Sequence, residues 1–313
     1  MSLNKSFWMP ALYLFWMTSF ACTAADSEPN MKEDAAAPTQ QLSFEQIDLD
    51  SLETTGFFSP KPVKIKGYLL KAKKEGTAPG AVLSPACNGL LMPSSGQILP
   101  NYRKMAKFLH DQGITVLLVD GFNPRGFKEI CTQSVKTRSI DTNTRLQDSL
   151  GGLLYLRSRG DVAADKIFMV TWGAAGSFQA MNKESPYYEK TGAGFTAAIM
   201  FYPECERVDS RFAPYAPIQM FVGEKDTWNP AAACLALAKR QVPGSASFDI
   251  KIYADTYHAF DQLRPPSLRT DAAVGPVMTG GNPESAADAY KTTAAFLSRF
   301  TDVGKNRVTE GAK

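Results

Sequence analysis

An aspartate and a histidine occupy corresponding places late in the chain, each just beyond a short apolar stretch. Asp226 follows residues 217–222 (PIQMFV), and His258 follows residues 247–253 (SFDIKIY). A histidine held by a carboxylate can act as a general base, because its imidazole titrates near neutral pH and the carboxylate orients the ring. The alternatives are a histidine bonded to a nearby carbonyl and an aspartate that caps the helix expected near Pro230.

A third segment has the residue types of a catalytic turn. Residues 171–176 (TWGAAG) join the apolar stretch 166–170 (KIFMV) to an expected helix that runs to Met181. A strand, a tight turn of small residues and a helix form the context of the nucleophile elbow in α/β-hydrolases. The elbow, the acid and the histidine also follow one another in the chain order of that fold.

The elements that must position these segments are strands alternating with helices. Continuous apolar runs predict buried strands, the first of the series being an exposed antiparallel one, and apolar residues at helical spacing predict the helices between them. The expected strands are 63–73, 81–86, 114–119, 166–170, 197–202, 217–222 and 247–253, and the expected helices lie around 102–109, 146–154, 176–181, 230–240 and 283–300. This pattern predicts an α/β fold with a mostly parallel, doubly wound sheet and helices on both faces. Chemistry in such sheets lies at the carboxyl ends of the strands, where all three segments fall.

Five segments resemble the dienelactone hydrolase family. They are 82–90 (VLSPACNGL), 118–126 (LVDGFNPRG), 167–177 (IFMVTWGAAGS), 220–234 (MFVGEKDTWNPAAAC) and 253–261 (YADTYHAFD). They span most of residues 63–300 in the family's order, and the last two are together the most specific. The resemblance implies an α/β-hydrolase fold and hydrolysis of esters or lactones by a nucleophile–His–Asp triad. In that triad, Asp226 is the acid and His258 is the base.

The elbow departs from the family pattern at its centre. The family has Gly-Trp followed by Ser or Cys, so that alignment on Trp172 puts Gly173, which has no side chain, at the nucleophile position. Loss of the nucleophile removes the acyl-enzyme route, although a serine protease lacking a triad member keeps a rate roughly 10³–10⁴-fold above water. Glycine adopts the strained elbow conformation at little cost, so we expect the fold to survive.

The resemblance also suggests the rest of the site. The backbone N–H groups of Ala174 and Asn88 would form the oxyanion hole. Trp172 and Trp228 are expected to contact the substrate. Arg125 would bind a substrate carboxylate or, alternatively, form a structural salt bridge.

The N-terminus is typical of a secretory signal. Lys5 precedes the apolar run 7–21, and small residues follow, which predicts a signal peptide over residues 1–25 and a secreted or periplasmic protein. Cys22 leaves open a lipoprotein, although Ser19 stands where a lipobox has Leu. An uncleaved anchor is a further alternative. The other boundaries that we expect are a polar linker over 26–42, an α/β-hydrolase domain over 43–300 and a polar tail over 301–313.

Four cysteines remain beyond the predicted signal peptide. In an oxidising compartment Cys87, Cys131, Cys205 and Cys234 permit three pairings. The expected strand order favours Cys87–Cys131 and Cys205–Cys234, because each pair would lie on loops at the same end of neighbouring strands. Four buried free thiols are the alternative.

Composition limits the function classes. The chain has 34 Lys+Arg against 31 Asp+Glu and is 44% hydrophobic, which is globular composition without the basic excess of a nucleic-acid binder. Two histidines and dispersed cysteines do not match zinc-site spacing, and no phosphate-binding loop is present, so we expect neither metal nor cofactor. The expected partner is a small-molecule ester, lactone or carboxylate, and no membrane unless Cys22 is lipidated.

Three functions fit these residues. The first is a secreted ester or lactone hydrolase that is weak or inactive because of Gly173. The second is a non-catalytic protein that keeps the pocket for a ligand, a pseudoenzyme. The third is a hydrolase in which His258, oriented by Asp226, activates a water molecule. In each case, the long aperiodic stretch between His258 and Asn282 is expected to form a lid.

Overall fold

The computed structural model describes residues 42–56, 61–73, 75–173, 176–191 and 194–301. These residues belong to one unit that begins at Leu42. The predicted signal peptide lies outside the described residues. So do the predicted linker, apart from Leu42, and the predicted tail, apart from Thr301.

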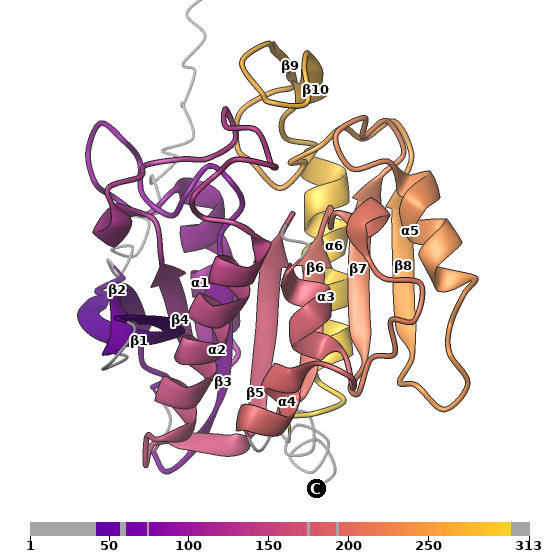
Figure 1. The fold of residues 1–313 in the computed structure, drawn as a ribbon. Coiled ribbons are helices and arrows are strands. Elements are labelled where there is room, and N and C mark those ends of the chain that lie inside the picture. The colour runs from indigo at the N-terminus through magenta and orange to yellow at the C-terminus, as the bar shows by residue number, and fades with distance from the viewer. Residues whose placement is uncertain (1–41, 57–60, 74, 174–175, 192–193, 302–313) are drawn as a thin grey trace, which may run out of the picture. The chain divides into compact units, whose positions relative to one another are not determined.

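One eight-stranded sheet runs through this unit (Figure 1). Its strands are β1 (Glu45–Thr55), β2 (Lys61–Leu70), β3 (Ala78–Ser84), β4 (Thr115–Asp120), β5 (Val162–Trp172), β6 (Ala197–Phe201), β7 (Ile218–Gly223) and β8 (Phe248–Tyr253). The spatial order is β1-β2-β4-β3-β5-β6-β7-β8. Strand β2 is antiparallel to both of its neighbours, and the strands from β4 to β8 pair in parallel. The carboxyl ends of the parallel strands therefore share one edge of the sheet.

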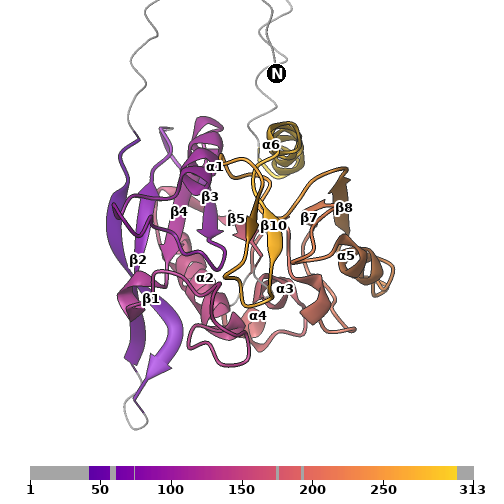
Figure 2. The same cartoon turned by 90° about the horizontal axis from the view of Figure 1, so that it is seen from above.

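Helices cover both faces of the sheet, as the view along it shows (Figure 2). The helices are α1 (Pro100–Asp111), α2 (Thr142–Arg157), α3 (Gly176–Met181), α4 (Pro186–Thr191), α5 (Ala231–Ala238) and α6 (Pro283–Leu297). Alternate residues of β5 enter different cores: Ile167 and Met169 pack with α2, α3 and α5, whereas Phe168 and Val170 pack with α1 and α6. Two-sided burial explains the continuous apolar strands, and it confirms the predicted doubly wound α/β-hydrolase fold.

Two local features differ from the prediction. Strand β2 is antiparallel and partly exposed as expected, but it is not the edge of the sheet, because β1, which was not expected, pairs along its outer side through residues such as Ile47 and Leu49. The stretch between His258 and Asn282 is not aperiodic throughout, since β9 (Ser267–Arg269) and β10 (Val277–Thr279) form a short antiparallel hairpin within it. Runs of three residues are too short to give a periodic signal.

Both favoured disulfides form, which confirms the predicted pairing. Cys87–Cys131 joins the loop after β3 to the segment between β4 and α2, and Cys205–Cys234 joins the short 3₁₀ helix Cys205–Arg207 to α5. Disulfides are typical of proteins in oxidising compartments. In the part of the chain that the structure describes, no helix has the length and apolar character needed to cross a membrane.

Removing the Cys205–Cys234 disulfide should destabilise this fold measurably. The bridge spans 29 residues, and opening a loop of that length restores unfolded-chain entropy equivalent to about 3–4 kcal/mol. The double variant Cys205→Ala/Cys234→Ala should therefore lose roughly 8–15 °C of Tm by scanning calorimetry. Mass spectrometry should show Cys87–Cys131 still formed, and an unchanged Tm would contradict the prediction.

Candidate active site

The loops after β7 and β8 bring Asp226 and His258 together. His258 Nδ1 lies 2.7 Å from Asp226 Oδ2, and both side chains are buried. Asp226 Oδ1 accepts the backbone N–H groups of Trp228 and Asn229, each at 2.8 Å. Asp226 does not cap α5, which starts after Pro230 without a side-chain cap. Since a carboxylate accepts, the shared proton belongs on Nδ1, which leaves Nε2 as the basic nitrogen.

Two aromatic rings hold the His258 imidazole in place. The Trp228 ring stacks on it with centroids 4.9 Å apart and planes inclined by 26°, and the Tyr202 ring lies 4.5 Å away. The Arg269 guanidinium lies over the Trp228 ring, 5.6 Å from the ring centroid. Nε2 makes no hydrogen bond with any residue that the structure describes. The ring is thus oriented at Nδ1 and available at Nε2.

Gly173 has the backbone of an elbow residue. Its φ is +62°, in the left-handed region that disfavours a side chain, and its N–H donates to the carbonyl of Phe201 at 3.0 Å. A Cβ built at this position would meet nothing nearer than Asn229 Nδ2 and the Tyr202 carbonyl, each at 3.9 Å. The conformation is that of a strained strand-to-helix turn, and there is room for a side chain.

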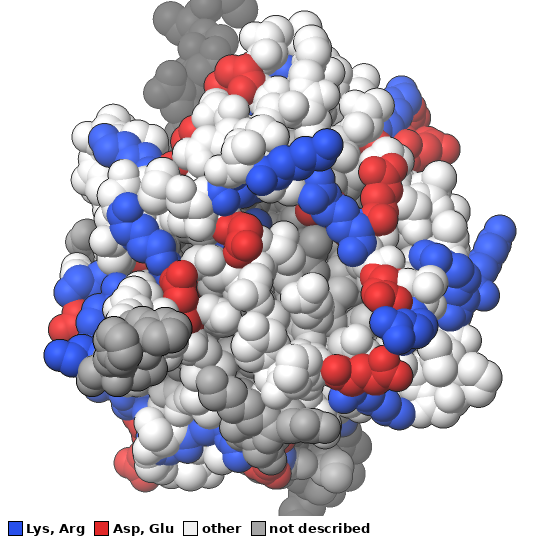
Figure 3. Space-filling view, in the orientation of Figure 1, with Lys and Arg blue, Asp and Glu red and all other residues white. Residues whose placement is uncertain are grey.

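Gly173 and His258 line one hollow of about 150 Å³, together with Trp228, Arg138 and Arg145; we call it the arginine hollow. The structure therefore brings the predicted elbow, base and one predicted substrate contact to the same space. Lys and Arg side chains also form a band across the upper part of this face of the molecule, below the β9–β10 hairpin (Figure 3).

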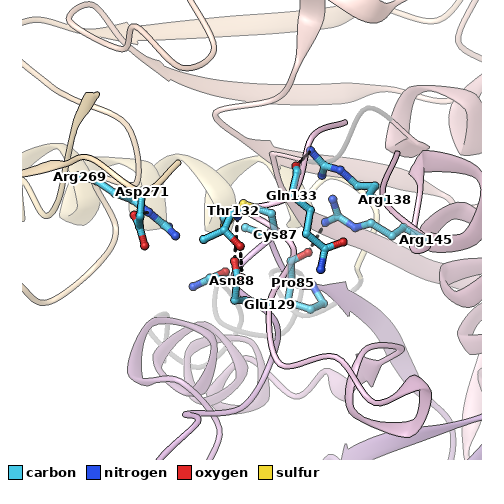
Figure 4. Close-up of a disulfide and its surroundings, with 12 residues drawn as sticks. Pro85, Cys87, Asn88, Glu129, Thr132, Gln133, Arg138, Arg145, Arg269 and Asp271 are labelled. Carbon is cyan, nitrogen blue, oxygen red and sulfur yellow. Dashed lines mark hydrogen bonds and ion pairs between the residues drawn. A yellow bond between two sulfur atoms is a disulfide. The ribbon is translucent and has the colours of Figure 1, made fainter. Parts of the chain in front are cut away.

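Arg138 and Arg145 were not predicted as site residues from the sequence. Arg145 donates to the carbonyl of Pro85, and Arg138 donates to the carbonyl of Gln133 at 3.4 Å (Figure 4). Neither guanidinium forms an ion pair with a described carboxylate, and Arg138 Nε is buried without a partner. Burial lowers the pKa of Arg145 to about 10, so this side chain is still charged at neutral pH. No motif marks the two arginines, since the hollow that they enter is assembled from distant segments.

Asn88 lies in the loop that follows β3, beside His258. Its Oδ1 accepts the Tyr102 hydroxyl at 2.7 Å, and that hydroxyl accepts the backbone N–H of Ala86 at 2.9 Å. The backbone N–H of Asn88 donates to no described residue. A rigid loop with a free N–H is suited to an oxyanion hole, and Ala174, the other predicted donor, lies outside the described residues.

Two expected substrate contacts need correction. The Trp172 side chain is completely buried and stacks on Phe201, so it does not reach the arginine hollow. Arg125 makes a bidentate ion pair with Asp148, at 2.9 Å for both bonds, and a further one with Glu53 at 2.7 Å. The alternative of a structural salt bridge is therefore the one that the structure favours for Arg125.

Asp261 is a further residue of the site that was not predicted from the sequence, although it ends one of the quoted segments. Its buried carboxylate accepts the Trp172 indole N–H at 2.7 Å, the Tyr202 hydroxyl at 2.9 Å and the Asn101 amide at 3.4 Å. Burial raises the pKa of Asp261, and these three donors oppose that rise. The residue joins the elbow strand to the ring that packs on His258.

The fold and the Asp226–His258 pair at its strand ends define an α/β-hydrolase. The chain belongs to the dienelactone hydrolase family, whose family model matches residues 65–301. It is 22% identical over 203 residues to a Bradyrhizobium protein named as a probable 2-oxo-3-(5-oxofuran-2-ylidene)propanoate lactonase, covering 62% of this chain and 78% of that protein.

Solved structures support the fold. A Klebsiella pneumoniae structure assigned to dienelactone hydrolase has a TM-score of 0.57 at 16% identity, covering 82% of this chain and all of that one. A thermophilic esterase from Thermogutta terrifontis has a TM-score of 0.55 at 14% identity, covering 85% of this chain and 95% of that one. At these identities, the likeness concerns the fold alone.

The backbone at the elbow can be tested by substitution. Gly173→Ala should cost about 1–2 kcal/mol of unfolding free energy, because Ala pays for the positive φ although the space around it is open. Gly160→Ala is the matched control, since Gly160 also has open space around it but no left-handed φ. It should be neutral or slightly stabilising in urea denaturation. Equal effects of the two substitutions would show that Gly173 is not strained.

Proposed function

We propose that this protein hydrolyses small carboxylate-bearing esters or lactones slowly, with a water molecule where the family uses a Ser or Cys side chain. Its family acts on esters or lactones, and the Bradyrhizobium relative is named as a lactonase. The observation that carries the proposal is the unpartnered Nε2 of His258, in the same hollow as Gly173. The space beside Gly173 suits a water molecule close to that nitrogen.

The reaction needs one base, and the substrate forms no covalent bond with the protein. His258 Nε2 takes a proton from water while the water oxygen attacks the ester carbonyl, and Asp226 stabilises the imidazolium that forms. The tetrahedral intermediate collapses with cleavage of the C–O bond to the alcohol. His258 then returns the proton to the departing alkoxide, which restores the neutral ring.

The developing oxyanion needs hydrogen-bond donors. The N–H of Asn88 supplies one in this proposal, and the N–H of Ala174, which follows Gly173, supplies the other. With these donors and a bound water, but without a side-chain nucleophile, we expect a rate well below that of a complete triad. Removing the nucleophile in a serine protease leaves a comparable residual rate, roughly 10³–10⁴-fold above water.

The arginine hollow favours a substrate with its own carboxylate. Arg138 and Arg145 form no ion pair with Asp141, Glu204 or Glu206, the acidic residues that also line the hollow, whereas Arg207 pairs with Glu204 at 2.5 Å. Charged donors in a partly buried hollow recognise an anion strongly. In this proposal, Arg138 and Arg145 bind the substrate carboxylate that Arg125 was expected to bind. The ion pairs of Arg125 keep it away from the hollow.

One observation favours the non-catalytic alternative. Glycine relieves the backbone strain at position 173, where φ is +62°, so loss of the nucleophile does not weaken the fold. A protein that binds the ligand without turnover would keep the same arginines and the same Asp226–His258 pair. Turnover by the unmodified chain decides between the two functions.

We also infer secretion or a periplasmic location. The two disulfides support an oxidising compartment, and the signal-like residues 1–25 would direct the chain there. Lipidation at Cys22 remains the alternative form of export.

Gly173→Ser should restore the triad. We expect kcat/KM for p-nitrophenyl acetate and for a simple lactone to rise at least about 100-fold, with a burst of one p-nitrophenol per chain, because an acyl-enzyme can now form. The unmodified chain should turn over slowly, without a burst, and His258→Ala should abolish the activity of both.

Three outcomes would contradict these assignments. A folded Gly173→Ser chain without added activity would overturn the elbow assignment. Slow turnover of the unmodified chain that survives His258→Ala would overturn the water route. Saturable ligand binding with no turnover at all would establish the non-catalytic alternative.

Arg138→Gln should weaken recognition of an anionic substrate. In the Gly173→Ser background, KM for mono-p-nitrophenyl glutarate should rise about 10- to 100-fold, because one charge-assisted hydrogen bond is lost. KM for p-nitrophenyl butyrate, which lacks the carboxylate, should change little. Arg207→Gln is the matched control, since Arg207 is already paired with Glu204. Equal effects on the two esters would rule out a carboxylate contact at Arg138.

A further inference from the structure

A second hollow, of about 500 Å³, lies against Asn88, and Gly173 does not line it. Its apolar walls are Leu99 and Pro100, at the start of α1, and Leu263, ahead of the β9–β10 hairpin. We call it the leucine hollow. Leu263 is 66% exposed although it is large and apolar. This volume is within the range of ligand sites in proteins, roughly 300–1,000 Å³.

A smaller hollow, which we call the gap, adjoins the leucine hollow and is lined by His258. The gap holds about 30 Å³ and is lined by His258, Trp228 and Tyr202. It shares Asn88 and Gln262, among others, with the leucine hollow. That volume holds only two or three water-sized groups, since each needs about 10–15 Å³, so it accommodates a few methylene groups more readily than a six-membered ring.

The two hollows differ in the charges that they offer. Figure 4 shows Arg138 and Arg145 on one side of Cys87, and Arg269 with Asp271 on the other. Arg269 is paired with that aspartate at 2.7 Å, unlike the two arginines across the disulfide.

The other cation of the leucine hollow is also fully engaged. Arg264 donates to Ser267 at 2.7 Å and to both oxygens of Thr279, at 3.1 and 2.5 Å. No acidic side chain lines this hollow among the described residues. Its lining is therefore mostly apolar and uncharged, whereas the arginine hollow is lined by charged groups, with Arg138 and Arg145 outside ion pairs in the described part of the chain.

We propose that the leucine hollow binds an unbranched aliphatic arm of the substrate, which reaches it through the gap beside His258. The inference rests on the proposed function, because it assigns the second arm of the same ester. The substrate class is then an ester with a carboxylate on one side of the scissile bond and a linear alkyl chain on the other. Burial of that chain against Leu99, Pro100 and Leu263 supplies the affinity.

Methyl ketones test the chain-length dependence without turnover, since the ketone carbonyl stands in for that of the ester. Calorimetric titration of the unmodified chain should give a Kd that falls about fourfold per methylene from 2-pentanone to 2-octanone. Cyclohexyl methyl ketone has the same eight carbons as 2-octanone and should bind at least about tenfold more weakly, because its ring fits the small volume of the gap poorly. A Kd that is independent of chain length, or equal for the two eight-carbon ketones, would overturn the proposal.

Two exposed leucines provide a matched pair of variants. Leu263→Glu places a charge in the hollow and should weaken 2-octanone binding about tenfold or more. Leu268→Glu is the control, because Leu268 is 59% exposed on β9 but does not line the hollow. It should leave the Kd unchanged. Both sites are exposed, so the Tm of each variant should match that of the unmodified chain, and equal weakening by the two variants would overturn the assignment.

The ketone titration and the hydrolysis assays test the two proposals independently. Chain-length-dependent binding by a chain that never hydrolyses an ester would leave the leucine hollow assigned and overturn the proposed catalysis. Hydrolysis that depends on His258, combined with ketone binding that ignores chain length, would do the reverse.

Discussion

The buried carboxylate of Asp261 accepts hydrogen bonds from three segments that are far apart in the sequence, and the geometry of the site depends on them. A buried charge is costly unless donors surround it. Moving Trp172, Tyr202 or Asn101 away would leave the carboxylate unsatisfied and destabilise the fold. Trp172 is the residue before Gly173, and Tyr202 packs on His258. One carboxylate thus fixes the turn that presents the elbow and the ring that holds the base. Neither Asp261 nor Tyr202 needs to touch the substrate to do this.

The fold and the acid–base pair could be predicted because their signals are local. Strands buried on both faces have continuous apolar sequences, and parallel strands must end at the same edge, which brings Asp226 to His258 without knowledge of any side-chain contact. The same argument paired Cys87 with Cys131 and Cys205 with Cys234. Topology alone sufficed in each case.

The residues that were misjudged are those whose partners lie elsewhere in the chain. Arg125 and Arg138 are both arginines, but the guanidinium of Arg125 is paired with Asp148 and Glu53. Nothing near Arg125 in the sequence indicates these partners. Trp172 lies beside the elbow in sequence, yet strand alternation turns its ring into the core. Position along a strand end therefore predicts which loop forms the site, whereas the direction and pairing of each side chain depend on packing.

Retention of Asp226 and His258 is not by itself evidence of catalysis. Asp226 Oδ1 organises the turn that contains Trp228 and Asn229, and the Asn229 amide in turn holds the Tyr202 carbonyl at 2.7 Å. The aspartate would therefore contribute to the fold even in a chain that had lost all activity, and a neutral histidine would satisfy its remaining oxygen.

What a purely structural pair does not require is a free basic nitrogen on a polar hollow. His258 keeps Nε2 without a partner among the described residues, in a hollow that Gly173 leaves open and that Arg138 and Arg145 line without forming an ion pair. These features do not depend on one another in the fold, and together they support the proposed binding of a carboxylate-bearing substrate.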